Sequence, residues 1–112
     1  MNNEEEVTMD TVIKEKKRTK TLKEHKIYHA DRIHRNCIRV GRNESYAHAN
    51  KKFDICWEFL QLEQTFITEP KIHNKGRRYD ILNLDTGDIV EIESDKSVKK
   101  KDADIIIYLE DD

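Results

Sequence analysis

The sequence has few of the features that staple small proteins together or anchor them in membranes. It contains two cysteines, Cys37 and Cys56, which are too few for a disulfide framework. It has no leader-like segment and no apolar run of the roughly 20 residues that cross a bilayer. These absences exclude a disulfide-rich secreted scaffold and a membrane-spanning protein, and they lead us to expect a reducing, cytoplasmic setting, the host cytoplasm if the protein is viral.

Apolar residues are also scarce for a chain of 112 residues. Hydrophobic residues make up 36% of the sequence and charged residues 39%, so we expect one small core with part of the chain outside it. The net charge of −2 hides a segregation, because Lys and Arg are in excess over residues 14–42 and acids over residues 81–95. This asymmetry favours a basic arm for a polyanion and an acidic site for a cation.

Three segments are expected from charge and hydrophobicity. Residues 1–26 predict a charged tail, disordered or loosely helical, because too little apolar surface is available to offset the entropy of ordering. Residues 27–42 have apolar positions at a rough three-to-four spacing, which predicts a basic helical arm with Arg39 and Arg42 facing nucleic acid. Residues 43–112 predict the folded domain.

The strongest helix signal runs from Asn43 to Leu62. Asn43 or Ser45 can cap its start, and apolar residues recur at helical spacing on one face, which we expect to pack on the core. The residues of this face are Tyr46, Ala49, Phe53, Cys56, Trp57 and Leu60. Asp54 and Glu58 lie one turn apart on a neighbouring stripe, where they form either an ordinary exposed pair or the edge of a site.

After this helix the hydrophobic period changes to two. Residues 66–73 predict a strand that Pro70 places at a sheet edge or a bulge, and residues 77–94 predict an acidic β-hairpin. The apolar run from Ala103 to Leu109 is typical of a buried strand. It follows a connection of about ten residues, close to the minimum for a parallel crossover, so a second helix there has one or two turns or is absent.

Carboxylates interrupt both strands of the hairpin. Glu91 and Glu93 alternate with aliphatic residues, so they project from the same side of a strand, about 7 Å apart. Such acids form either a solvated face or a site for a hard divalent cation. Asp80 shares their face if the connection has two or four residues, whereas a three-residue Asp85–Gly87 loop would place Asp80 opposite Ile92, on the wrong face.

The expected helix, three-stranded meander, crossover and final strand form an αβββ(α)β order of the α/β class. With Asp80, ten intervening residues and Glu91-Ile92-Glu93, residues 44–109 resemble the PD-(D/E)xK nuclease superfamily, the fold of restriction endonucleases and archaeal Holliday-junction resolvases. The resemblance implies a restriction-endonuclease-like mixed sheet with a helix packed on it. It also implies an archaeal or viral metal-dependent endonuclease that hydrolyses DNA, with branched DNA among the candidate substrates.

Carried over by position, the resemblance makes Asp80 and Glu91 the metal ligands, for Mg²⁺ or Mn²⁺. Glu93 stands where a lysine is usual, as a third ligand or as the group that orients the attacking water. The metal would stabilise charge on the phosphate and lower the pKa of a bound water.

Other members of the implied site are open. The resemblance implies a further acid from the first helix, either Asp54 or Glu58, and either Lys96 or Lys71 in place of the missing lysine. The basic residues expected to follow a nucleic-acid backbone are Lys75, Arg77, Arg78, Lys99, Lys100 and Lys101.

Two other functions fit the sequence. A nucleic-acid-binding module of the same fold with a decayed site would bind DNA without cleaving it, and a small interaction protein of a virus or mobile element would use its charges for a protein partner. Resolvases and many restriction enzymes act as dimers. The resemblance therefore also implies a homodimer, through the exposed face of the Tyr46–Leu60 helix or the segment before it.

Overall fold

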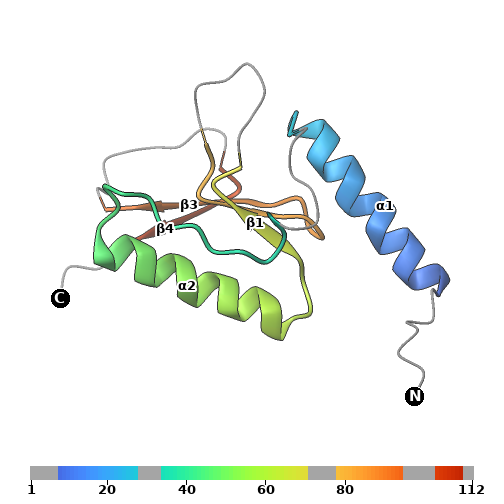
Figure 1. Ribbon diagram of the computed structural model, residues 1–112, viewed down its shortest axis with the longest axis horizontal. Coiled ribbons are helices and arrows are strands. Elements are labelled where there is room, and N and C mark those ends of the chain that lie inside the picture. Colours follow the sequence, from blue (N-terminus) through green and yellow to red (C-terminus); the bar gives the residue numbers. More distant parts are fainter. Residues whose placement is uncertain (1–7, 28–33, 71–77, 95–102, 110–112) are drawn as a thin grey trace.

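Two helices and a four-stranded mixed sheet make up the fold (Figure 1). The computed structural model describes residues 8–27, 34–70, 78–94 and 103–109. The elements are, in chain order, α1 (Met9–Glu24), α2 (Tyr46–Gln61), β1 (Phe66–Thr68), β2 (Ile81–Asn83), β3 (Ile89–Glu93) and β4 (Ile105–Tyr108). The α/β class and the mixed sheet with a helix packed on it agree with the expectation from sequence.

The strands lie in the order β1-β2-β3-β4. The first three form the expected antiparallel meander, in which Thr68 lies opposite Ile81 and Ile81 opposite Val90. β4 pairs with β3 in parallel, with Glu91 opposite Ile106. The connection that makes this crossover includes residues 95–102, so the question of a second helix there falls outside the described residues.

β1 is an edge strand, as Pro70 indicates, and the chain just before α2 covers its open edge. The backbone N–H of Asn36 donates to the Phe66 carbonyl (2.8 Å), and the Phe66 N–H donates to Asn36 Oδ1 (3.1 Å). The Thr68 hydroxyl accepts from the Arg39 N–H and donates to the Cys37 carbonyl, both at 2.8 Å. These bonds satisfy an edge that would otherwise expose unpaired backbone groups.

The same bonds explain why the expected helical arm is wrong for residues 37–42, which form no helix. Asn36 has a positive φ of 57°, a conformation that Asn tolerates and an α-helix does not. The backbone groups that a helix would use internally are committed to β1 instead. Residues 28–33 of the expected arm lie outside the described residues.

α1 occupies most of the segment expected as a disordered or loosely helical tail. The Thr8 side chain caps its start, and Leu22 and Ile27 are buried against the sheet. Arg18 Nε donates to Asp85 Oδ1 (2.8 Å), which fixes the helix to the turn between β2 and β3. Only the C-terminal end of this segment contacts the core, because Met9 and Ile13 near its start are exposed.

α2 covers one face of the sheet, as Figure 1 shows. Ser45 caps the helix by accepting a hydrogen bond from the His48 N–H (3.1 Å), and Ile55 and Cys56 are buried against Ile81 and Val90. Cys56 is fully buried, as expected, and this burial raises the pKa of its thiol to about 12.

The expected packing face of α2 is wrong for its large aromatic residues and right for Cys56. Tyr46, Phe53 and Trp57 are 84%, 50% and 54% exposed. The stripe that packs on the sheet is polar in its N-terminal half and apolar in its C-terminal half, so hydrophobic spacing alone selects the wrong side. The members of this inward stripe are Glu44, just before the helix, and His48, Lys52, Ile55, Cys56 and Phe59.

Side chains of the hairpin alternate between two clusters. Ile81, Val90 and Ile92 point toward α2, whereas Leu82 and Ile89 point to the opposite face, where the end of α1 packs. β4 is less buried than its apolar sequence predicts, because it lies at a sheet edge; Ile105 is 39% exposed. The central strand β3 therefore holds Glu91 and Glu93, and Asp80 lies just before the central strand β2.

Candidate functional site

The connection between β2 and β3 decides which face Asp80 occupies. Asn83 pairs with Asp88, and four residues, 84–87, join them. Asn83 Oδ1 accepts from the N–H groups of the next residues in the turn, and Gly87 takes the positive φ (+80°) that the turn requires. This is a four-residue connection, one of the two lengths for which the sequence predicts Asp80 on the same side as the glutamates.

The ladder between β2 and β3 ends one step before Asp80. Its pairs are Ile81 with Val90 and Leu82 with Ile89, and a continued register would set Asp80 opposite Glu91, but the chain bends at Asp80. The sequence requirement named Glu93 as the direct partner, with Glu91 on the diagonal. The observed register is shifted by two residues, but the bend turns the Asp80 carboxylate toward His48 of α2. Register alone therefore does not give Asp80 the side of the sheet that the glutamates occupy.

The Asp80 carboxylate replaces a backbone group of the ladder. In a continued antiparallel ladder the N–H of Ile92 would donate to the carbonyl of Tyr79. Here it donates to Asp80 Oδ2 (2.7 Å), and the chain bends at Asp80. The carboxylate is therefore anchored on the backbone of β3, between Glu91 and Glu93.

Glu91 and Glu93 share the face of β3 that points away from α2. Their neighbours Val90 and Ile92 belong to the cluster under α2, so alternation turns the two glutamates to the other side. Glu91 is 2% exposed, whereas Glu93 is partly exposed and its Oε1 accepts from the Ser94 N–H (3.1 Å). Glu91 and Glu93 are neighbours on the same face of β3, but only Glu93 is accessible to solvent.

A group of charged side chains, here called the α2 polar cluster, joins α2 to β1 and to Asp80. It consists of Glu44, His48, Lys52, Glu69 and Asp80. Lys52 is fully buried, and its ammonium donates to the Arg39 carbonyl (2.8 Å), to Glu44 (2.9 Å) and to Glu69 (3.4 Å). These three acceptors match the three donors of a lysine, which is the condition for burying one.

His48 links the two halves of the α2 polar cluster. Its Nδ1 bonds to Glu44, and its Nε2 lies 3.4 Å from Asp80 Oδ2. The same Asp80 oxygen therefore faces both a ring nitrogen from α2 and a backbone N–H from β3. With three carboxylates to one lysine, the cluster carries an excess of acid at the end of the hairpin.

The pKa of Glu44 is lowered. Burial acts in the opposite direction and raises it, but the hydrogen bonds from the Gly41 N–H, Lys52 and His48 together outweigh burial. The Gly41 bond is 2.8 Å long. Glu44 is therefore charged in the folded protein well below neutral pH, as a partner of the buried Lys52 must be.

The structure does not bring the proposed helical acids to Asp80. Asp54 and Glu58 are exposed on α2, and Glu58 lies ten residues beyond His48, about 15 Å along the helix axis. Glu44 occupies the place near Asp80 that one of them was expected to fill. Sequence reasoning overlooked it, although Glu44, His48 and Lys52 recur every four residues, the spacing of one helical stripe.

The predicted nucleic-acid contacts fall into two groups. Arg39, Arg42 and Arg78 are exposed. The remaining predicted basic residues lie outside the described part of the chain, together with both candidates for the missing lysine; these are Lys71, Lys75, Arg77, Lys96, Lys99, Lys100 and Lys101.

Within residues 8–27, 34–70, 78–94 and 103–109, no three His, Cys, Asp or Glu side chains are grouped so that they could hold a metal ion. Neither α1 nor α2 has the length and apolar character that crossing a bilayer requires.

Comparisons with family models, with curated proteins and with solved structures find no match to this chain. The site is therefore interpreted from its own geometry.

Proposed function

We propose that this protein is a nuclease that hydrolyses phosphodiester bonds of DNA with a divalent metal, on a restriction-endonuclease-like fold. The order of elements supports this: a helix, an antiparallel meander and a parallel fourth strand follow one another as the resemblance implies. Of the two acids of the motif, Asp80 lies immediately before β2 and Glu91 lies on β3, and β2 and β3 are the central strands of this sheet.

The position of Asp80 carries the proposal. Its carboxylate accepts a hydrogen bond from the N–H of Ile92, the residue between Glu91 and Glu93. A structural role for the hairpin does not require this arrangement, since an ordinary ladder would use the Tyr79 carbonyl. The bend brings the Asp80 carboxylate to the backbone of β3 between the two glutamates, while His48 contacts it from the α2 side.

The donor set fits Mg²⁺ in its chemistry. Mg²⁺ takes oxygen ligands and is commonly held by one or two carboxylates together with substrate phosphates, so Asp80 and Glu91 suffice on the protein side. When bound there, the metal would stabilise charge on the phosphate and lower the pKa of a water ligand. Ile92 and His48 hold the Asp80 carboxylate in place, and Glu93, next on the same side of β3, orients the attacking water.

Basic side chains flank this site. Arg78 is exposed and lies two residues before Asp80. The side chain of Arg39 is also exposed, and the Arg39 carbonyl accepts a hydrogen bond from Lys52 of the α2 polar cluster. Contacts from such residues to phosphates would position DNA without reading its sequence. Arg42, three residues further, extends the same basic segment toward the start of α2.

Cleavage of branched, linear and single-stranded DNA, in Mg²⁺ or Mn²⁺ against EDTA, tests the proposal. We expect metal-dependent cleavage of at least one substrate, and we expect Asp80→Asn and Glu91→Gln to lower its rate by at least about 100-fold. Both replacements keep the shape of the side chain, and the Asn carbonyl can still accept from Ile92. The matched control is Asp88→Asn, at the opposite end of the same hairpin, which should cleave like the wild type.

A DNA-binding module with a decayed site is the second candidate, and the burial of Glu91, only 2% exposed, favours it. A buried acid cannot easily meet a substrate phosphate. If no substrate is cleaved while DNA is retained equally with metal and with EDTA, the nuclease proposal fails and the binding module stands. If Arg39→Ala and Arg78→Ala leave DNA retention unchanged, the proposed DNA contacts fail as well.

A further inference from the structure

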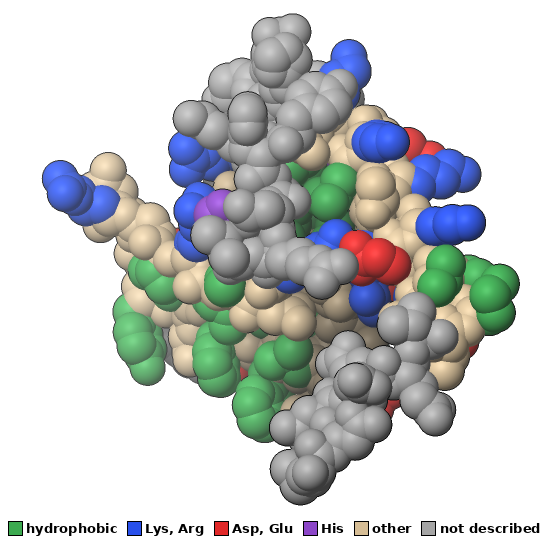
Figure 2. Space-filling model, turned by 45° about the vertical axis from the view of Figure 1, so that its right-hand side comes forward, with side chains coloured by type: hydrophobic (Ala, Val, Ile, Leu, Met, Phe, Trp, Pro, Cys, Tyr) green, Lys and Arg blue, Asp and Glu red, His purple; other side chains and the backbone are tan. Residues whose placement is uncertain are grey.

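The side of α1 that points away from the sheet carries a row of lysines, here called the α1 lysine stripe. It consists of Lys16, Lys20 and Lys23, spaced by four and three residues, which is the spacing along one side of a helix. All three are exposed, whereas Leu22 on the opposite side is buried. α1 holds six basic and three acidic residues, an excess of three positive charges in a chain whose net charge is −2. Figure 2 shows Lys and Arg side chains gathered on the right of the molecule, the side on which α1 lies.

The C-terminal half of α1 runs along the β2–β3 hairpin. At the turn of the hairpin, Arg18 Nε donates to Asp85 Oδ1 (2.8 Å). Just past the end of the helix, the rings of His25 and Tyr79 meet edge to face, with centroids 5.6 Å apart. The helix is thus held at two points, one at the turn and one at the residue before Asp80, and its lysine stripe is held with it.

α1 also lies on the face of the sheet that the two glutamates occupy. Leu22 belongs to one buried cluster with Leu82 and Ile89. Side chains alternate along β3, so Ile89, Glu91 and Glu93 point to the same side. Toward the C-terminal end of α1, the stripe therefore approaches the end of the hairpin where the glutamates lie.

We infer that the α1 lysine stripe binds the phosphate backbone of DNA and leads it to the proposed active site. At a rise of about 1.5 Å per residue the stripe is about 10 Å long, and one strand of B-DNA carries a phosphate roughly every 3.4 Å along its axis, so the three lysines face about three phosphates. Such contacts position DNA without reading its sequence. The inference deepens the proposed function and rests on it, since it takes DNA as the substrate of that site.

The acids of α1 do not cancel the stripe. Glu15 lies on the inner side of the helix, where its Oε1 accepts a hydrogen bond from Arg35 Nη1 (2.7 Å). Glu24 lies 3.8 Å from Lys20, and both side chains are well exposed. A surface ion pair of this kind contributes little, so a phosphate replaces Glu24 at small cost.

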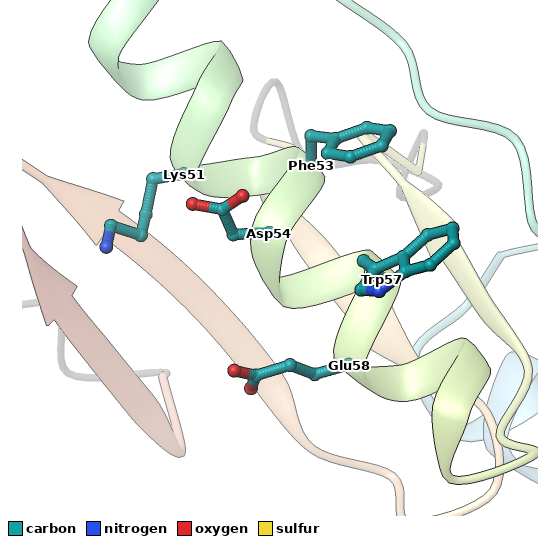
Figure 3. Close-up of a pocket in the computed structure, with 5 residues that line it drawn as sticks. All are labelled: Lys51, Phe53, Asp54, Trp57 and Glu58. Atoms are coloured by element: carbon teal, nitrogen blue, oxygen red, sulfur yellow. The ribbon is translucent and has the colours of Figure 1, made fainter.

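The outward face of α2 is less suited to DNA. It bears an open hollow of about 450 Å³, here called the outward hollow, which is drawn in Figure 3 and lined by Lys51, Phe53, Asp54, Trp57 and Glu58. The rings of Phe53 and Trp57 stack on each other, with centroids 6.2 Å apart. Exposed rings can stack on unpaired bases, but that use requires a basic surround. Two of the three charged residues of the outward hollow are acids, which repel phosphates.

A lipid surface fits the stripe less well than DNA does. Met9 and Ile13 continue the stripe toward the start of α1 and are exposed. A helix that lies in a membrane interface presents a broad apolar face with Trp, Phe or Leu residues, however, and the single leucine of α1, Leu22, is buried against the sheet. Two exposed apolar residues do not make such a face.

Fluorescence anisotropy of a labelled linear DNA duplex, titrated with the full chain in EDTA over a range of salt concentrations, tests the inference. Replacing Lys16, Lys20 and Lys23 together by Gln should weaken binding about 100-fold at low salt. It should also lower the slope of log affinity against log salt concentration by about 2.7, since each phosphate contact contributes about 0.9. Lys20→Gln alone should lower the slope by about 0.9. The matched control is Lys14→Gln, on the other side of α1 and paired with Asp10 (3.4 Å), which should leave the slope unchanged.

A slope that the triple variant leaves unchanged overturns the inference. An equal loss in Lys20→Gln and Lys14→Gln also overturns it, because total charge alone would then account for binding. Co-sedimentation with vesicles of phosphatidylcholine and phosphatidylserine is the second measurement. Binding to these vesicles that needs the stripe, in a chain whose binding to DNA does not, overturns the inference in favour of a lipid surface.

The outcome is separate from that of the cleavage assay, because EDTA removes the metal that cleavage requires. A slope that depends on the stripe in a chain that cleaves no DNA supports α1 as a DNA contact and removes only the nuclease proposal. Cleavage by a chain whose slope does not depend on the stripe removes only the inference. Circular dichroism of each variant confirms that the fold is retained.

Discussion

The two long faces of α2 reverse the usual distribution of charged and aromatic residues. The inward face buries Lys52 completely, whereas the outward face leaves Trp57 54% exposed. The reversal arises because polar contacts, not apolar ones, hold the N-terminal half of the inward stripe in place. Lys52 binds Glu44 and Glu69, and His48 lies against Asp80. Only the second half of that stripe packs by apolar contact.

This difference shows what fixes the rotation of a helix on a sheet. A stripe of large apolar residues gains free energy wherever it is covered, by this chain or by another one. A buried lysine has few acceptable positions, because each of its donors needs an acceptor. The α2 polar cluster supplies those acceptors from the Arg39 carbonyl, Glu44 and Glu69, so it determines which face of α2 turns inward.

The strongest test of the comparison replaces adjacent lysines. Lys52→Met should lower the free energy of unfolding by about 3 kcal/mol, because it leaves the buried Glu44 without its main countercharge. Lys51→Met, one residue earlier and on the rim of the outward hollow, should change it by less than about 0.5 kcal/mol. Urea unfolding followed by circular dichroism measures both. Equal effects would show that Lys52 is not buried as described.

A second test uses acid. The pKa of Glu44 is lowered on folding from its ordinary value of 4.5, so its contribution to stability is fully present above that pH and is lost as the pH falls through the folded-state value. Glu44→Gln should cost roughly 2 kcal/mol at pH 7, since charged hydrogen bonds to Lys52 and His48 are lost. The difference between the two proteins should shrink as the pH is lowered below 4.5.

Urea midpoints measured for the wild type and for Glu44→Gln, from neutral to acid pH, provide the readout. Glu63→Gln, an exposed acid beyond the end of α2, is the control and should follow the wild type at every pH. A difference between wild type and Glu44→Gln that stays constant with pH would mean that the charge of Glu44 contributes nothing, and the role given to the α2 polar cluster would be lost.

Much of the sheet was predictable because its signals are local. The period of two, the turn residues around Gly87 and the position of Pro70 lead directly to a meander with β1 at the edge. The final apolar run correctly predicted a strand parallel to β3, but not its exposure, since an edge position depends on which elements cover the sheet. The restriction-endonuclease-like identity of the fold stays a prediction.

The candidate site was predictable in part. Glu91 and Glu93 lie on the expected strand, Asp80 lies in the bend just before β2, and the connection length left open by the sequence proved to be four residues. The α2 polar cluster was missed because its members are far apart in sequence and each has an ordinary exposed alternative. Only the four-residue recurrence of Glu44, His48 and Lys52 hints at it, and hydrophobic periodicity does not detect a polar stripe.

A third, smaller test concerns the start of α2, where the two faces begin. Ser45→Ala should lower the free energy of unfolding by about 1 kcal/mol, because the N–H of His48 loses its acceptor. Ser45→Asp keeps an acceptor at the same position and should restore the wild-type value. The comparison is made by thermal and urea unfolding. Failure of Asp to restore stability would argue that Ser45 acts through some contact other than the cap.

The smallest expected effect is the most informative about the orientation of α2. Trp57→Ser removes the only tryptophan of the chain, yet it should change the free energy of unfolding of the monomer by no more than about 0.5 kcal/mol, because the side chain already faces solvent. Phe66→Ala, a fully buried aromatic on β1, should cost about 3–5 kcal/mol under the same conditions. Unfolding must be measured at a concentration low enough to exclude association. If Trp57→Ser costs as much as Phe66→Ala, the aromatic residues of α2 pack on the sheet after all, Lys52 must turn toward solvent, and the α2 polar cluster fails.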